Sequence, residues 1–129
     1  MKWFTKIFFI FFLLPFFSNA QQVIFCEQVD NFGNPKNASK EFSISEKGGF
    51  FKILVKLNKK VDAGKIIFDV YSMKESKEIF HNSLRMEVKP DLTWFFKEIT
   101  FFKPGEYHVY VYDYRDQLLG VGQVLIKMR

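Results

Sequence analysis

The two histidines, His81 and His108, are the side chains of this 129-residue chain with the widest scope for acid–base chemistry. An unperturbed imidazole changes charge near neutral pH, which suits it to proton transfer and to metal binding. Neither histidine has metal-ligand spacing to the other or to Cys26, and no nucleophile motif lies beside either one. We therefore assign no catalytic residue, no metal ligand and no cofactor. A small secreted hydrolase with His81 or His108 as its base is kept as an alternative function.

The clustered acidic and amide side chains are better explained by turns than by ion binding. Residues 30–34 read Asp-Asn-Phe-Gly-Asn, which lacks the acidic residue that closes a calcium loop. Asp113 and Asp116 flank Tyr114 and Arg115, and aspartate favours such positions because its carboxylate binds the local backbone. Both segments are predicted to be turns.

Residues 104–114 are the least ordinary part of the chain, because ring side chains alternate there with valines. Successive side chains of a strand point to opposite faces, so Tyr107, Val109 and Val111 share one face, which we expect to be the core face. The opposite face, which then points outward, carries His108, Tyr110, Tyr112 and Tyr114.

The outward rings are the candidate binding surface. Trp94 lies in the preceding predicted strand and joins them if the two strands pair. Aromatic rings give a large contact area at low entropic cost and are enriched at binding surfaces. They also stabilise a sheet by cross-strand pairing alone. A structural role, a partner or dimer surface, and a platform for a small ligand or glycan therefore all stay open here. The candidate binding residues are His108, Tyr110, Tyr112, Tyr114 and Trp94.

Residues 1–20 have the layout of a secretory signal peptide. Lys2 and Lys6 precede or flank an apolar run at 7–17, and small residues at 18–20 supply a cleavage site after Ala20. The run is shorter than the roughly 20 apolar residues that cross a bilayer, although an uncleaved anchor is the alternative. We expect residues 1–20 to be removed and residues 21–129 to form a single domain. The protein is then secreted or periplasmic, with no membrane span after cleavage.

Apolar residues recur with a period of two along residues 21–129, and no long amphipathic helical pattern interrupts them. Residues 73–78 are expected to be a polar loop or a short helical turn. Seven or eight short strands, each with one apolar face, predict an all-β antiparallel sandwich. The expected strands cover residues 23–29, 41–45, 50–57, 65–71, 83–89, 93–102, 105–113 and 118–127.

Residues 105–113, Gly-Glu-Tyr-His-Val-Tyr-Val-Tyr-Asp, resemble the penultimate strand of immunoglobulin-like and polycystic-kidney-disease-type modules of bacterial envelope proteins. That strand reads Gly-x-Tyr-x-Val-x-Val with an aspartate soon after. The resemblance implies an immunoglobulin-like sandwich in which Tyr107 forms the tyrosine corner. The second cysteine of true immunoglobulin domains would fall at Val109, so no such disulfide forms. Cys26, the only cysteine, is expected to pack as a small hydrophobe.

The net charge of +5 falls to (19 − 2) − 14 = +3 without residues 1–20, and the basic residues are scattered along the strands. This argues against nucleic-acid binding, because that function needs a basic stripe. The resemblance implies a non-enzymatic binding or structural module and carries over no catalytic residue. The sequence therefore predicts a secreted or periplasmic module that binds another envelope or secreted protein through its aromatic sheet face. Self-association as an envelope component is the other alternative.

Overall fold

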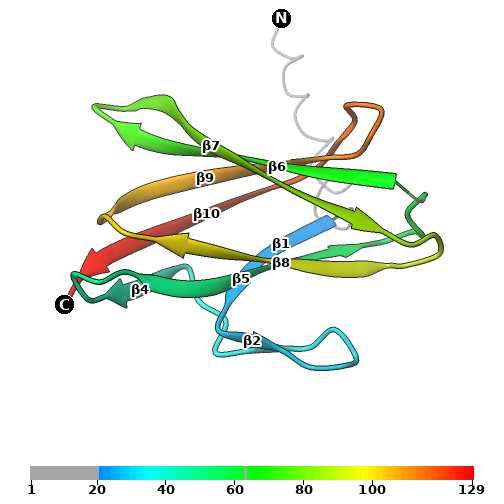
Figure 1. Cartoon of the computed structure of the whole chain (residues 1–129), viewed down its shortest axis with the longest axis horizontal. Coiled ribbons are helices and arrows are strands. Elements are labelled where there is room, and N and C mark those ends of the chain that lie inside the picture. Colours follow the sequence, from blue (N-terminus) through cyan, green and yellow to red (C-terminus); the bar gives the residue numbers. More distant parts are fainter. Residues whose placement is uncertain (1–20, 63) are drawn as a thin grey trace, which may run out of the picture.

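The computed structural model describes residues 21–62 and 64–129, and the regular structure in that part of the chain is entirely β-strand (Figure 1). The predicted signal peptide, residues 1–20, lies outside the described residues. The strands are β1 (Gln21–Cys26), β2 (Gln28–Val29), β3 (Pro35–Lys36), β4 (Glu41–Ile44), β5 (Gly49–Leu57), β6 (Gly64–Lys74), β7 (Lys77–Val88), β8 (Trp94–Phe101), β9 (Gly105–Tyr112) and β10 (Leu118–Met128).

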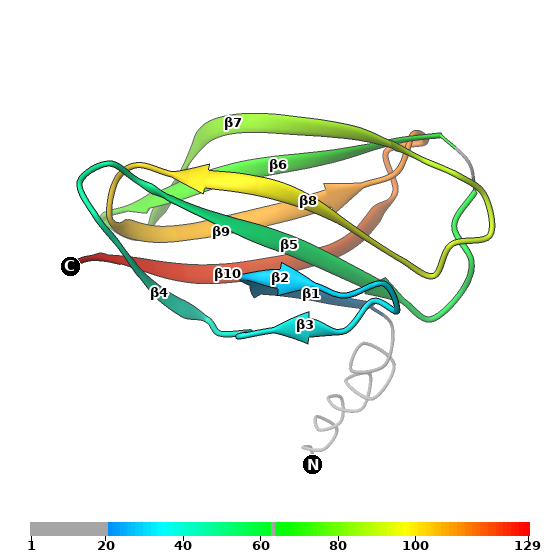
Figure 2. The same ribbon diagram turned by 60° about the horizontal axis from the view of Figure 1, so that its bottom comes forward.

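The strands form two sheets packed face to face, with a short hairpin outside them (Figure 2). The three-stranded sheet has the order β1-β5-β8, and the five-stranded sheet has the order β4-β10-β9-β6-β7. The hairpin consists of β2 and β3. Neighbouring strands are antiparallel except for β4 and β10, which run parallel.

The core lies between the inner faces of the two sheets and follows the predicted alternation. In β9, Tyr107 is 3% exposed and Val109 and Val111 are fully buried. The facing strand β5 contributes Ile53 and Val55, which are also fully buried. Because the only cysteine is a free thiol, this apolar burial, worth about 25 cal/mol per Å², holds the sheets together without a disulfide.

A tyrosine corner links the two sheets, as the sequence predicted. The Tyr107 hydroxyl donates a hydrogen bond of 2.9 Å to the carbonyl oxygen of Lys103, in the connection between β8 and β9. The Tyr107 ring packs on Phe101, with 4.5 Å between ring centroids. Between them Gly105 has φ +147°, a backbone conformation that side chains disfavour. The chain therefore turns sharply out of one sheet and into the other at this point.

The prediction of an all-β, immunoglobulin-like sandwich is confirmed. The amino-terminal region is divided between the sheets, with β1 in the three-stranded sheet and β4 parallel to β10 in the five-stranded sheet. Strands β8 and β9 then carry the chain across through the tyrosine corner, which is characteristic of this fold. In the described residues, eight strands have four or more residues, in line with the seven or eight expected.

The hairpin between β6 and β7 differs from the sequence prediction of a loop or helical turn at 73–78. Both strands continue into this segment, and only Glu75 and Ser76 connect them. These two residues have φ of 51° and 66°, the left-handed pair that a two-residue hairpin turn needs. The prediction was wrong because the usual asparagine–glycine signal of such a turn is absent from the sequence.

The β2–β3 hairpin covers the outer face of the three-stranded sheet as a partial third layer (Figure 1). Leu54 points away from the core in β5 and is nevertheless fully buried. Cys26 is likewise fully buried, as predicted, and burial raises the pKa of its thiol. At the hairpin tip the Asp30 carboxylate accepts the amide N–H groups of Phe32 and Asn34 at 2.8 and 2.9 Å, which confirms the predicted turn.

Replacing Tyr107 with phenylalanine should lower the free energy of unfolding by about 1 kcal/mol, the usual net value of one hydrogen bond. The ring stays in the core, so the change removes only the bond to the Lys103 carbonyl. Urea denaturation followed by tyrosine and tryptophan fluorescence measures the difference. Tyr112→Phe is the matched control, since in the described residues the Tyr112 hydroxyl forms no hydrogen bond. Equal stability of Tyr107→Phe and wild type would contradict a stabilising corner.

Candidate functional site

The outward side chains of β9 lie in the middle of the five-stranded sheet. Strand β6 pairs with one side of β9 and β10 with the other. His108 stands opposite Tyr71 of β6, and Tyr110 stands opposite Val121 of β10. Tyr112, at the end of β9, stands opposite Ile67 of β6. The outward parity predicted for His108, Tyr110 and Tyr112 therefore places them on one continuous sheet surface.

Ring-to-ring contacts join three strands on this surface. The Tyr71 ring meets the Tyr110 ring edge to face at 5.4 Å between centroids, and it meets Phe80 of β7 in the same way at 5.7 Å. Phe80 is 57% exposed. We call Tyr71, Phe80, Tyr110 and Tyr112 the ring face. Tyr71 and Phe80 were missed because their positions depend on the pairing of β6 and β7, which no local pattern determines.

His108 is held between two carboxylates at the edge of the ring face. Its Nδ1 lies 2.7 Å from a Glu78 carboxylate oxygen, and its Nε2 lies 2.7 Å from a Glu106 carboxylate oxygen. The Tyr110 hydroxyl donates a 2.6 Å hydrogen bond to the same Glu78 oxygen. The His108 side chain is only 11% exposed, whereas the side chains of Glu78 and Glu106 are 33% and 49% exposed. Glu78, from the start of β7, thus ties that strand to β9.

The charges of this cluster move its pKa values in opposite directions. Burial disfavours the His108 imidazolium, but its hydrogen bonds to Glu106 and Glu78 raise the pKa of His108 above its ordinary value. The hydrogen bond from Tyr110, followed by that from His108, lowers the pKa of Glu78. The bond to the Glu78 carboxylate in turn raises the pKa of Tyr110 to about 12. Tyr110 therefore stays a protonated donor, and its ring is fixed in orientation.

The two histidines lie in separate environments. Both ring nitrogens of His108 face carboxylates, so neither is available to take a proton from a nucleophile. The His81 ring packs edge to face on Tyr107 at 5.5 Å between centroids, beside the tyrosine corner. These contacts give the imidazole of His108 a structural role in the sheet surface and that of His81 a packing role.

Trp94 does not join the ring face, contrary to the prediction. Strand β8 pairs with β5 in the three-stranded sheet, because the tyrosine corner carries the chain to the other sheet before β9 begins. The Trp94 ring lies instead against Gly33 of the β2–β3 hairpin, where a Cβ atom on Gly33 would come within 2.7 Å of the indole. The ring of Trp94 therefore anchors the hairpin.

Tyr114 is also separate from the ring face. It follows the end of β9 in the turn toward β10, is 52% exposed, and has the Arg115 guanidinium 5.2 Å from its ring centroid. The turn is built on Asp113, whose buried carboxylate accepts the amide N–H groups of Arg115 and Gln117. This confirms the predicted Asp113 turn but moves Tyr114 off the sheet surface.

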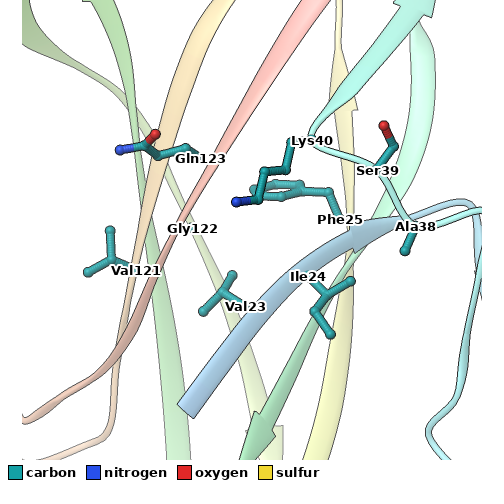
Figure 3. Close-up of a pocket in the computed structure, with 9 residues that line it drawn as sticks. All are labelled: Val23, Ile24, Phe25, Ala38, Ser39, Lys40, Val121, Gly122 and Gln123. Atoms are coloured by element: carbon teal, nitrogen blue, oxygen red, sulfur yellow. The ribbon is translucent and has the colours of Figure 1, made fainter. Parts of the chain in front are cut away.

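A groove of about 570 Å³ lies on a different side of the sandwich, where β1 and β10 face each other (Figure 3). Its walls are residues of β1, of β10 and of the segment that crosses between the sheets before β4. Sequence reasoning did not find it, because three segments far apart in the chain form it. The lining residues are Val23, Ile24, Phe25, Ala38, Ser39, Lys40, Val121, Gly122 and Gln123.

Neither surface offers a metal centre. Among residues 21–62 and 64–129, no three His, Cys, Asp or Glu side chains are gathered where they could hold a metal ion.

In the same residues, no helix has the length and apolar character needed to cross a membrane.

Comparison with known proteins gives likeness to solved structures alone. No protein-family model matches the chain, and no curated protein matches it. Among solved structures, an immunoglobulin-like protein from Pseudomonas aeruginosa is similar, with 13% sequence identity and a TM-score of 0.46. The likeness covers 83% of this chain and 91% of that one. The strand order and the tyrosine corner of this chain carry the fold assignment.

The His108 cluster should make stability depend on pH near neutrality. The folded-state pKa of His108 is raised, so its stabilisation is complete below the unfolded value of about 6.5 and is lost as pH rises through the folded value. The difference in unfolding free energy between wild type and His108→Asn should therefore shrink as the pH rises above about 6.5. Urea denaturation at several pH values measures it. Glu106→Gln, which removes one partner, should flatten the curve in part, and a difference independent of pH would contradict the assignment.

Proposed function

We propose that this protein is a non-enzymatic, secreted or periplasmic module that binds another protein through the ring face. The observation that carries the proposal is that the Tyr71 ring contacts both the Phe80 ring and the Tyr110 ring on an outward sheet surface. Among the described residues no hairpin covers this surface, whereas the β2–β3 hairpin covers the outer surface of the other sheet. Phe80 is exposed and the three tyrosines of the ring face are partly exposed, and a contiguous aromatic surface that stays accessible in this way is typical of a contact site.

The ring face is prepared for binding in two ways. The hydrogen bond from Tyr110 to Glu78 and the clamp on His108 fix side chains that would otherwise lose conformational freedom on association. An apolar side chain extends the contact area at its margin, since Val121, which stands opposite Tyr110, is 45% exposed. The carboxylates of Glu78 and Glu106 border the rings, so the partner surface is expected to present apolar groups with donors or cations around them.

The sequence of β9 supports a narrower grouping of the domain, and the sequence of residues 1–20 supports its export. The Gly-x-Tyr-x-Val-x-Val pattern at Gly105–Tyr112 is the one that resembles polycystic-kidney-disease-type modules of bacterial envelope proteins, and we propose that grouping for this domain. The layout of residues 1–20 supports export. An exported module meets its partner in the cell envelope or outside the cell.

Simultaneous replacement of Tyr110 and Tyr112 by serine should reduce the amount of partner protein that is captured. Loss of two central rings is expected to weaken binding by about tenfold or more, as at other aromatic interface centres. Quantitative pull-down from an envelope extract of the source cells, with wild type and variant side by side, measures the loss. The matched control is Phe50→Ser, which removes a ring that is 70% exposed on β5 of the other sheet.

Two further measurements sharpen this test. Tyr110→Phe keeps the ring and loses only the bond to Glu78, so it should retain most of the binding. An unchanged captured set with the double variant would show that the ring face is not the binding site. Wild-type mass that rises with concentration, and no longer rises in the double variant, would identify the partner as a second copy.

Export predicts a defined amino terminus. The protein purified after expression from its full-length sequence should begin at Gln21, because cleavage is expected after Ala20. Intact-protein mass spectrometry gives the answer directly. A mass that includes residues 1–20 in the exported fraction would instead support an uncleaved anchor.

A further inference from the structure

One edge of β10 is paired over only part of its length. Strand β9 pairs with β10 along its length, but on the other side β4 pairs with it only from Leu125 to Met128. The Leu125 amide donates a 2.8 Å hydrogen bond to the Lys40 carbonyl on that side. Backbone groups alternate in direction along a strand, so the N–H and C=O groups of Val121 and Gln123 point to the same edge. In the described residues no strand pairs with them there.

The unused edge of β10 is one wall of the 570 Å³ groove (Figure 3). Strand β1, with Val23 and Ile24 among the lining residues, forms the opposite, apolar wall. A groove with an apolar wall and a free strand edge is the usual receptor for an extended peptide, whose backbone adds to the sheet while alternate side chains enter the groove. The volume lies within the range of about 300–1,000 Å³ that ligand sites occupy.

The groove is closed at one end by backbone. The Ser39 amide donates to the Phe25 carbonyl of β1 at 3.0 Å, and the next residue, Lys40, accepts the Leu125 amide of β10. Residues 39 and 40 therefore bridge the two sheets across the end of the groove. A strand lying in the groove and running toward this bridge must end there or leave the sheet.

Lys40 gives the closed end its charge. It is the only charged residue among those that line the groove. Within residues 21–62 and 64–129 its ammonium group forms no ion pair. A chain terminus that stops beside this ammonium is stabilised if it is a carboxylate and destabilised if it is an amine.

We propose that the groove binds the free carboxyl-terminal tail of a partner protein as an added strand. The tail runs parallel to β10, in the direction of β4, because this direction brings its terminal carboxylate to Lys40 at the closed end. Its backbone pairs with Val121 and Gln123, and its apolar side chains face Val23 and Ile24. This site uses the backbone edge of β10 and none of the four rings of the ring face, and it does not depend on the function proposed for that face.

The test is selection from a library of hexapeptides attached to beads by their amino ends, with free carboxylates, using the labelled full-length protein. An otherwise identical library with amidated ends is screened in parallel. We expect binders from the free-carboxylate library, enriched in apolar residues at alternate positions. Amidation of a selected peptide should lower its affinity by about fivefold, the value of one partly exposed charge pair. N-methylation of the amides that face β10 should abolish binding.

Variants and hydrogen exchange locate the site. Lys40→Gln should weaken the selected peptides by about fivefold, whereas Lys47→Gln, which removes a lysine outside the groove, should leave them unchanged. The bound peptide should slow exchange of the Val121 and Gln123 amides and leave the free edge of β7 unaffected. The proposal is overturned if the free-carboxylate library yields no binders, or if binders are indifferent to amidation and to Lys40→Gln. It is also overturned if the protected edge is β7, or if a second copy of the protein protects the β10 edge instead.

Discussion

The hydrogen bond from the Tyr107 hydroxyl to the Lys103 carbonyl fixes where the chain passes from one sheet to the other. Because Tyr107 must point into the core to make it, the parity of all of β9 is determined from that residue onward. Val109 and Val111 then fall in the core, while His108 and Tyr110 fall outside. The same corner separates β8 from β9, so the aromatic residues of these consecutive strands serve different surfaces.

The ring face and the groove are built by different kinds of interaction but share β10. Val121 stands opposite Tyr110 in the sheet, while its backbone belongs to the strand edge that lines the groove. On the inner side of the same strand, Gly122 leaves no space for a side chain, because a Cβ atom there would come within 2.6 Å of Val23. This close approach joins β1 to β10 and holds the groove walls together. A strand added at the groove would therefore stiffen the sheet that supports the rings.

Local sequence patterns predicted the features that depend on a single strand. They did not predict the features that depend on which distant strands pair. The alternation in β9 was enough to assign its core and outward faces, since each side chain follows from its neighbour. Tyr71 and Phe80 could not be assigned, because their contact depends on the left-handed turn at Glu75 and Ser76, which lacks the asparagine or glycine that usually signals such a turn. Trp94 was misplaced because the partner of β8 is β5, far away in the sequence. The groove, formed by three distant segments, left no local pattern to read.

The burial of Cys26 has a consequence for the kinetics of the fold. Its Sγ lies 3.9 Å from the Lys52 carbonyl, fully buried beside the first residues that lead into the β2–β3 hairpin. Thiolate chemistry needs both deprotonation and access, and the raised pKa and the cover of the hairpin oppose both. The rate at which an added thiol reagent modifies the protein is thus set by how often this outer layer lifts. Reaction of the Cys26 thiol would therefore report local opening of the β2–β3 hairpin layer without separation of the two sheets.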